Sequence, residues 1–344
     1  MPFTFTAQLP LSRHAVDRDH LTRALPGLFD ELRADAATRV LPLWHGSTLL
    51  VEEPGAVSAG THELAAHDSR GGTPRPRLRL FAPAPALVER TPIELYLGRS
   101  LADEGAEPAG TRLVAAILDD DGAAALEPDA SLWVPLRTVA SALSDRDAGL
   151  FTEALALANW HASHAHCPRC GAATQVEGGG WSRRCPVDGS QVFPRTDPAV
   201  IVLITDDDDR ILLGSNAMWE DNRYSLLAGF VEPGESLEAA VIREMFEESG
   251  LRVTDPVYLG SQPWPFPASI MFGFTARLDD GQQPAGVLPD GEEILDLRWF
   301  SRSELAAAGD SIILPGRSSI ARAIIEQWYG GPMDFGPDLV AGWR

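Results

Sequence analysis

Three glutamates, Glu244, Glu247 and Glu248, stand three and four positions apart in a segment with helical spacing. In a helix this spacing places all three carboxylates on one face. They also fall in the last turns, where the helix dipole and like-charge repulsion each cost a few tenths of a kcal/mol to about 1 kcal/mol. Hard cations such as Mg²⁺ or Mn²⁺ reverse these penalties, because they seek clustered carboxylate oxygens. The pattern indicates a metal site, and a solvated acidic face is the alternative.

The surrounding segment, 229–251, has residues that typically start and stop a helix at its two ends. A Pro-Gly turn at 233–234 precedes the helix, and Glu235 or Ser236 can cap it. Gly250 can end it. An apolar stripe indicates that the helix packs on a sheet, and its main members are Leu237, Val241 and Met245.

This segment resembles the Nudix box: Gly229, five residues, Glu235, seven residues, then Arg-Glu-apolar-any-Glu-Glu-any-Gly-apolar. The resemblance implies an α/β/α sandwich and metal-dependent cleavage of a nucleoside diphosphate linkage. It also implies that Arg243 orients the acidic residues by ion pairing and that Glu235 braces the loop. The implied ligands of Mg²⁺ or Mn²⁺ are the backbone carbonyl of Ala228 and the side chains of Glu244, Glu247 and Glu248. Glu247 or Glu248 would take the proton of the attacking water.

Beyond this helix, residues 261–269 read Ser-Gln-Pro-Trp-Pro-Phe-Pro-Ala-Ser. Each proline removes a backbone donor, so we do not expect a regular strand here. The spacing alone fits a rigid surface loop or a polyproline ligand. At this distance from a Nudix box, however, the segment is similar to the signature of the NADH pyrophosphatase (NAD-capped RNA hydrolase) subfamily. The resemblance implies a pocket for the nicotinamide mononucleotide half of the substrate, with polar contacts from Gln262 and Ser269.

The same resemblance implies further contacts. Phe193 and Phe230 would sandwich the adenine, one of them supplied by the neighbouring subunit of a homodimer. Core packing is the alternative for either ring. Glu293 fits an additional metal-binding glutamate, and Glu292 competes with it. The looser correspondences to substrate contacts are Arg137 and Ala321.

All of the chain's cysteines fall in one short segment, as Cys167, Cys170 and Cys185. With Asp188 they nearly form the CxxC…CxxC pattern of a zinc ribbon, which has four cysteines in the subfamily. A carboxylate can ligate zinc, although rarely in structural sites. Three arrangements stay open: zinc bound by the cysteines and Asp188, zinc with His166 or His164 as the fourth ligand, or no metal. We expect any zinc here to be structural.

The length of 344 residues suits two or three domains. We expect an α/β protein with a mixed α/β N-terminal domain at 1–145 and a Nudix catalytic domain at 195–330. Between them lie a linker helix and the zinc-ribbon-like segment, at 146–194, and a tail follows at 331–344. The expected strands are 39–51, 77–81, 92–98, 111–118, 132–139, 200–205, 211–214, 253–260, 269–278 and 294–300. Helices are expected at 148–161, within the box, and at 317–328.

The net charge of −21 repels phosphate backbones over most of the surface, which disfavours a general nucleic-acid binder. Phosphate-bearing ligands would need local devices such as divalent cations. No apolar run is long enough to span a membrane, and the first residues lack the features of a secretory signal. With only three cysteines, a reducing cytoplasm is the expected location.

Together these features predict metal-dependent hydrolysis of NADH or NAD⁺ to nicotinamide mononucleotide and AMP. Removal of NAD caps from RNA 5′ ends is a related activity that the resemblance implies. A second possibility keeps the chemistry and changes the substrate to another dinucleotide such as ADP-ribose. A third is a non-catalytic nucleotide-sensing or nucleic-acid-binding module, which the survival of every box glutamate disfavours.

Overall fold

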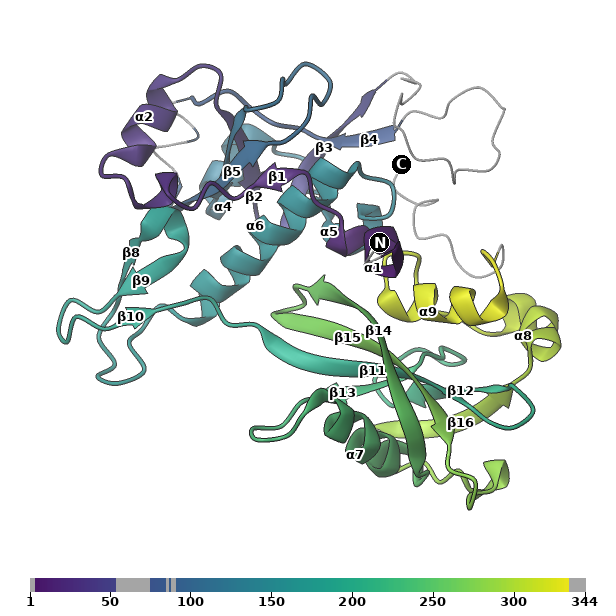
Figure 1. The fold of residues 1–344 in the computed structure, drawn as a ribbon. Helices are drawn as coiled ribbons and strands as arrows, with labels where there is room; N and C mark the ends of the chain where they lie inside the picture. Colours follow the sequence, from purple (N-terminus) through teal and green to yellow (C-terminus); the bar gives the residue numbers. More distant parts are fainter. Residues whose placement is uncertain (1–3, 54–74, 85–86, 88–90, 334–344) are drawn as a thin grey trace. The chain divides into compact units, whose positions relative to one another are not determined.

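The structure, a computed structural model, describes residues 4–53, 75–84, 87 and 91–333 (Figure 1). The chain divides into two compact units. Unit 1 combines Met1–Arg13 with Arg195–Arg344, and unit 2 is His14–Pro194. The domain limits expected from the sequence stay predictions, but residues 4–13 pack with unit 1 and not with the N-terminal domain. The expected tail lies outside the described residues from position 334 onward.

Unit 1 is built on a mixed six-stranded sheet of order β14-β15-β11-β12-β16, in which β13 also pairs with β11. Its strands are β11 (Asp197–Thr205), β12 (Ile211–Asn216), β13 (Leu227–Phe230), β14 (Val253–Trp264), β15 (Ser269–Leu278) and β16 (Ile294–Phe300). The central strand β11 runs parallel to β15 and is buried along most of its length. Such burial explains its continuous β-branched run, because both faces of the strand are covered.

Helices cover both faces of this sheet (Figure 1). Alternate residues of β11 point to opposite faces. Val200 and Val202 pack against α7 (Leu237–Ser249), whereas Ile201 and Leu203 pack against α9 (Ile320–Tyr329). The α9 face also carries α8 (Arg302–Ala308), α1 (Thr4–Gln8) and the 3₁₀ turn η1 (Pro10–Ser12). Two further 3₁₀ turns are η5 (Pro284–Gly286) and η6 (Gly309–Ser311). The predicted α/β/α sandwich is confirmed.

Helix α7 begins and ends as its sequence predicts. Of the two candidate caps, Ser236 is the one that acts: its hydroxyl accepts a hydrogen bond from the backbone N–H of Ala239 at 3.2 Å. Gly250 ends the helix in the left-handed conformation, with φ of 68°. Its N–H donates to the carbonyl of Phe246, which satisfies a group that the helix end would otherwise leave unpaired.

The expectation that residues 261–269 form no strand was wrong for their first part. Strand β14 continues to Trp264, and Pro263 lies opposite Ile270 of β15. A proline is tolerated here because β14 is at the edge of the sheet, where one row of backbone donors has no partner strand. A turn then connects Trp264 to Ser269.

Unit 2 contains three small sheets, with strand orders β1-β5-β6-β2, β4-β3-β7 and β10-β9-β8. Its strands are β1 (Val16–Asp17), β2 (Arg39–Leu43), β3 (Ser47–Glu53), β4 (Arg75–Leu78), β5 (Ile93–Ser100), β6 (Arg112–Ile117), β7 (Trp133–Pro135), β8 (Gln175–Glu177), β9 (Ser182–Arg184) and β10 (Gln191–Val192). Its helices are α2 (Leu28–Ala34), α4 (Asp120–Leu126), α5 (Leu136–Val139) and α6 (Asp145–Ser163), with 3₁₀ turns η2 (Thr22–Ala24), η3 (Ala130–Leu132) and η4 (Gly178–Gly180). The predicted linker helix is α6.

Two expected strands of unit 2 needed correction. The run 39–51 is two strands, because His45 and Gly46 adopt positive φ in a tight turn between them. The run 132–139 stops being a strand at Pro135, and α5 follows. Within the part of the chain that the structure describes, no helix is both long and apolar enough to cross a bilayer.

The capping geometry of α7 generates a first prediction. Replacing Ser236 with alanine removes the acceptor for the Ala239 N–H, which we expect to lower the free energy of unfolding by about 0.5–2 kcal/mol. Thermal and urea-induced unfolding measure this loss. Ser236→Asp is the matched control, because aspartate retains a capping oxygen and should keep most of the stability. Equal losses in both variants would show that the cap contributes nothing.

Candidate functional site

A glycine on β13 allows α7 to approach the sheet closely. A Cβ atom at Gly229 would lie only 2.0 Å from the Cδ atom of Glu244. The carboxyl group of Glu244 therefore occupies the space that any other side chain at this position would need. This contact explains sterically why the first position of the box is a glycine, which the spacing of the motif in the sequence does not explain.

Arg243 ties the acidic residues together. Its guanidinium donates to both carboxylate oxygens of Glu235, at 2.5 and 3.2 Å. It also lies 2.8 Å from a carboxylate oxygen of Glu247 and 3.0 Å from one of Glu244. A further hydrogen bond runs to the backbone carbonyl of Phe230 at 2.9 Å. These partners raise the pKa of Arg243, with the Glu235 hydrogen bonds as the largest cause. The orienting role expected for Arg243 and the bracing role of Glu235 fit this geometry.

Glu248 is the most enclosed of the three helix glutamates, with 5% of its surface exposed. Burial is the largest cause that raises its pKa to about 8, and the negative charges of Glu244 and Glu293 act in the same direction, against the lowering effect of a hydrogen bond from the Ala228 backbone. Its Oε2 atom is buried and has no hydrogen-bond partner among the described residues. Glu247, in contrast, has a half-exposed side chain.

Glu293, and not Glu292, belongs to this carboxylate cluster. Its charge is among the largest causes that raise the pKa values of both Glu244 and Glu248, and the charge of Glu292 is not. The Oε1 atom of Glu293 accepts a hydrogen bond from the side-chain amide of Asn216 at 3.2 Å. Of the two glutamates expected from the sequence, the structure favours Glu293, and its role as a metal ligand stays a prediction.

The loop that presents Glu293 is fixed by Asp290. One carboxylate oxygen of Asp290 accepts hydrogen bonds from three successive backbone N–H groups, each at 2.9 Å, those of Glu292, Glu293 and Ile294. Our sequence analysis missed Asp290 and Asn216. The Asp-Gly pair at 290–291 is a signal of a turn of this kind, whereas nothing local marks Asn216.

These residues fit a hard divalent cation. An unpaired, buried carboxylate oxygen that is also repelled by the charges of Glu244 and Glu293 is costly unless a positive charge satisfies it. Oxygen donors from Glu244, Glu248 and Glu293 match the ligand preference of Mg²⁺ or Mn²⁺. The Ala228 backbone lies beside Glu248, to which it donates a hydrogen bond.

Two residues expected to contact the substrate are buried in the structure and hydrogen-bond to the protein itself. Gln262 is fully buried: its amide nitrogen donates to the carbonyl of Ser318 at 3.0 Å, and its amide oxygen accepts from the N–H of Ile320 at 2.7 Å. Both polar groups of Gln262 are thus used at the start of α9. Ala321 is 1% exposed, and its N–H donates to the capping hydroxyl of Ser319. Neither side chain is available to a ligand in this structure.

The remaining expected substrate contacts lie at the surface of their units. Phe230 of unit 1 is 60% exposed and Phe193 of unit 2 is 62% exposed, so core packing explains neither ring. Ser269 is half-buried at the start of β15, opposite Trp264. Arg137 is exposed on α5 of unit 2. Their contacts with a substrate stay predictions.

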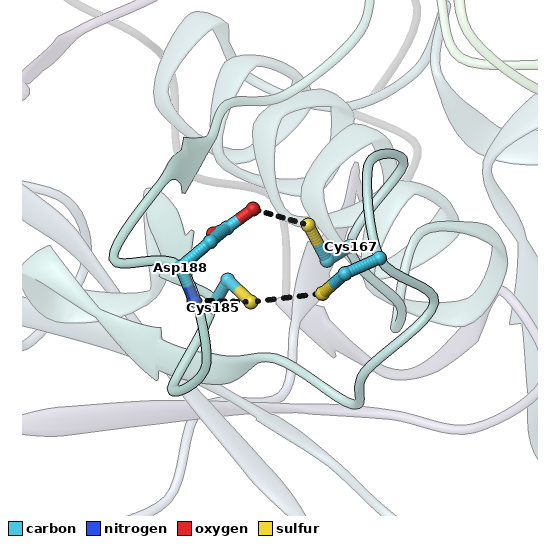
Figure 2. Close-up of side chains that lie close together, drawn as sticks. Cys167, Cys185 and Asp188 are labelled. Carbon is cyan, nitrogen blue, oxygen red and sulfur yellow. Dashed lines mark hydrogen bonds between the residues drawn. The ribbon is translucent and has the colours of Figure 1, made fainter.

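The cysteine segment gathers four possible metal ligands (Figure 2). One ligand atom from each of Cys167, Cys170, Cys185 and Asp188 lies within 4.8 Å of the others. The Oδ2 atom of Asp188 is 3.6 Å from the sulfur of Cys167, and the sulfurs of Cys170 and Cys185 are 3.4 Å apart. This arrangement fits a tetrahedral zinc site. No histidine joins the cluster in the described residues, and His164 instead contacts the hydroxyl of Ser163.

Ser190 orients Asp188 within this cluster. The Oδ1 atom of Asp188 accepts hydrogen bonds from the backbone N–H and the hydroxyl of Ser190, at 2.9 and 2.6 Å, which lower the pKa of Asp188. Ser190 also hydrogen-bonds Cys167 and, with backbone N–H groups of Arg169 and Cys170, lowers the pKa of that thiol to about 7. These hydrogen bonds favour the deprotonated forms of Asp188 and Cys167, which are the forms that bind metal. The pKa of the Cys185 thiol is instead raised to about 11, with burial and the neighbouring Asp188 and Cys170 side chains among the causes. Sequence reasoning missed Ser190.

Burial of Glu248 generates a prediction on stability and pH. The folded pKa of Glu248 is raised from its usual value of 4.5 to about 8. At pH values between these two, the metal-free protein therefore holds a proton that the unfolded chain has lost. The stabilising contribution is complete below about pH 4.5 and is lost as the pH rises through about 8. Glu248→Gln should therefore flatten the fall in melting temperature between pH 6 and 8.

Thermal unfolding without added divalent ions measures this difference, which at this chain length corresponds to about 2–4 °C for each kcal/mol. Glu292→Gln is the control, since Glu292 is not among the main causes of the raised pKa of Glu248. A wild-type slope in Glu248→Gln would contradict the assigned environment of Glu248.

Comparison with family models covers most of the chain. Residues 195–316 match the NUDIX domain, residues 162–193 match the NADH pyrophosphatase zinc ribbon domain, and residues 37–160 match the NADH pyrophosphatase-like rudimentary NUDIX domain. The third match identifies the fold of unit 2 as a relative of the catalytic fold, which the sequence analysis did not foresee.

Curated relatives agree with these matches. The NAD-capped RNA hydrolase NudC of Mycobacterium bovis (strain BCG / Pasteur 1173P2) is 46% identical over 220 residues, which cover 60% of this chain and 69% of the relative. NudC of Stutzerimonas stutzeri is 42% identical over 49% of this chain and 58% of its own length. The human NAD-capped RNA hydrolase NUDT12 is 35% identical over 54% of this chain and 42% of its own length. With the box, the carboxylate cluster and the ribbon in place, this chain belongs to the NADH pyrophosphatase (NudC) family of Nudix hydrolases.

Proposed function

We propose that this protein hydrolyses the pyrophosphate linkage of NADH or NAD⁺, giving nicotinamide mononucleotide and AMP. The observation that carries the proposal is the unpaired, buried carboxylate oxygen of Glu248 within a cluster of three glutamates. Relatives named as NAD-capped RNA hydrolases support the choice of substrate and extend it to NAD caps at RNA 5′ ends. Nothing in the described residues favours ADP-ribose, and a product assay over these dinucleotides separates the alternatives.

The chain's own residues hold and orient the reacting groups. Glu244, Glu248 and Glu293 would bind Mg²⁺ or Mn²⁺ with the Ala228 carbonyl, and Glu247 would complete this set. A metal bound there would neutralise phosphate charge and lower the pKa of a bound water molecule. Arg243 fixes Glu247 through the 2.8 Å ion pair while leaving its carboxylate half-exposed. Glu247 or Glu248 receives the proton of the attacking water.

The proposal also includes how the protein recognises adenine, that it forms a homodimer, and that it acts in the cytoplasm. The exposed rings of Phe193 and Phe230 each present a flat apolar face on which a purine can stack. In a homodimer, one ring would come from each subunit, and Ser269 and Arg137 would contact the rest of the substrate. The three unpaired thiols agree with a reducing cytoplasm.

Turnover of NADH with Mg²⁺ or Mn²⁺ tests the proposed activity. We expect Glu248→Gln and Glu293→Gln each to lower kcat by about 10²-fold or more. Each variant loses a negatively charged carboxylate that would hold the metal or accept the proton of the attacking water. Glu292→Gln is the matched control and should keep wild-type turnover. The same assay over a range of pH, with Glu247→Gln and with Glu248→Gln, shows which variant loses the acidic limb of the profile, where a general base gains its proton. Full turnover by Glu248→Gln would exclude the proposed site.

We also propose that the ribbon binds one structural zinc ion through its three cysteines and Asp188. The convergent ligand atoms and the ribbon family match support this ligand set. Elemental analysis of purified protein should give about one zinc per chain. Asp188→Ala should reduce zinc content and the melting temperature, whereas His164→Ala should change neither. Zinc retained in Asp188→Ala and lost in His164→Ala or His166→Ala would assign the fourth ligand to histidine instead.

A further inference from the structure

The N-terminal residues of the chain form part of the catalytic unit. Residues 4–12, which we call the N-terminal arm, contact β14 through both α1 and η1. Leu9 and Leu11 are almost fully buried, and Leu9 shares an apolar cluster with Ile320 and Ile324 of α9. The arm is thus packed as a core element of unit 1.

Two glycines allow this close packing. A Cβ atom at Gly260 of β14 would lie 2.5 Å from the hydroxyl of Thr6 and 2.9 Å from the ring of Phe5. Gly273 of β15, the cross-strand partner of Gly260, would place its Cβ 2.8 Å from Ile324 of α9. Because paired residues point to the same face of a sheet, the arm and α9 lie on one face over this glycine pair.

The arm ends at the segment that the sequence analysis linked to the substrate pocket. The hydroxyl of Ser12 donates to the carbonyl of Ser261 at 2.8 Å. The next residue, Gln262, bonds the start of α9 through both of its polar groups. Side chains two positions apart in a strand share a face, so Gln262 projects on the same side as Gly260. The arm and α9 therefore both hold the end of β14, on the same face of the sheet.

We propose that the N-terminal arm is a positioning element that fixes residues 261–269 for the nicotinamide mononucleotide half of the substrate. This inference rests on the proposed function. An edge strand has a row of unpaired backbone groups and is free to shift unless something covers it. The arm supplies that cover at Gly260 and Ser261, immediately before the proline-rich turn. The box glutamates are carried by α7 on the opposite face, so the arm affects substrate binding and leaves the chemical step unchanged.

The test is Gly260→Ala in the full-length protein, because the added methyl group displaces the arm at Thr6 and Phe5 without altering either. We expect KM for NADH to rise about tenfold with kcat within about twofold of wild type. KM for ADP-ribose, which lacks the nicotinamide ring, should rise less. Hydrogen exchange should increase in residues 4–12 and 261–264. Gly286→Ala is the matched control, since a Cβ there meets nothing within 4 Å.

Two further variants separate positioning from a general loss of structure. Thr6→Ala in the Gly260→Ala background removes the 2.5 Å contact and should restore KM toward wild type. Phe5→Ala alone should raise KM with kcat retained, and it serves if Gly260→Ala does not fold. Faster exchange in the arm without a change in KM would overturn the arm's role while leaving the proposed function intact. A wild-type protein without NADH turnover would overturn both.

Discussion

Burial of Glu248 beside other carboxylates is the constraint on which the catalytic unit depends. The repulsion and desolvation that raise its pKa to about 8 favour a looser helix. Three features oppose that tendency: the guanidinium of Arg243 between Glu235 and Glu247, the absence of a side chain at Gly229, and the apolar packing of α7 on the sheet. The helix is therefore held in an arrangement whose electrostatic cost a bound cation relieves.

The two faces of the sheet of unit 1 serve different tasks. On one face, α7 presents the carboxylates, and its apolar stripe packs on Val200 and Val202. On the other face, α9 and the N-terminal arm secure the end of β14 through Gln262 and Ser261. Strand β11 lies between the two clusters and is rigidly paired on both sides. The proposed metal site and the proposed substrate pocket therefore depend on different residues.

The features that the sequence predicted are those whose partners lie close along the chain. The box, the caps of α7 and the ligand spacing of the ribbon are all local, so spacing and residue type determine them. Gln262 was assigned to the substrate because its true partners, Ser318 and Ile320, are 56 and 58 positions away. Likewise, only pairing with β15 extends β14 through Pro263, and only folding brings Asn216 to Glu293. Long-range contacts of this kind leave no periodic trace in a single sequence.

The two proposed metal sites share one hydrogen-bonding arrangement. At each site, one oxygen of a carboxylate accepts hydrogen bonds from the protein, and the other oxygen is left to face the other proposed ligands. Ser190 holds Oδ1 of Asp188 while Oδ2 faces Cys167, and Glu248 accepts from Ala228 while its Oε2 has no partner among the described residues. Fixing one oxygen limits the side chain's rotation, so less conformational entropy is lost when the other oxygen binds a cation. In the proposed zinc site, Ser190 would allow a carboxylate to serve as the fourth ligand, because it orients Asp188 toward the cysteines.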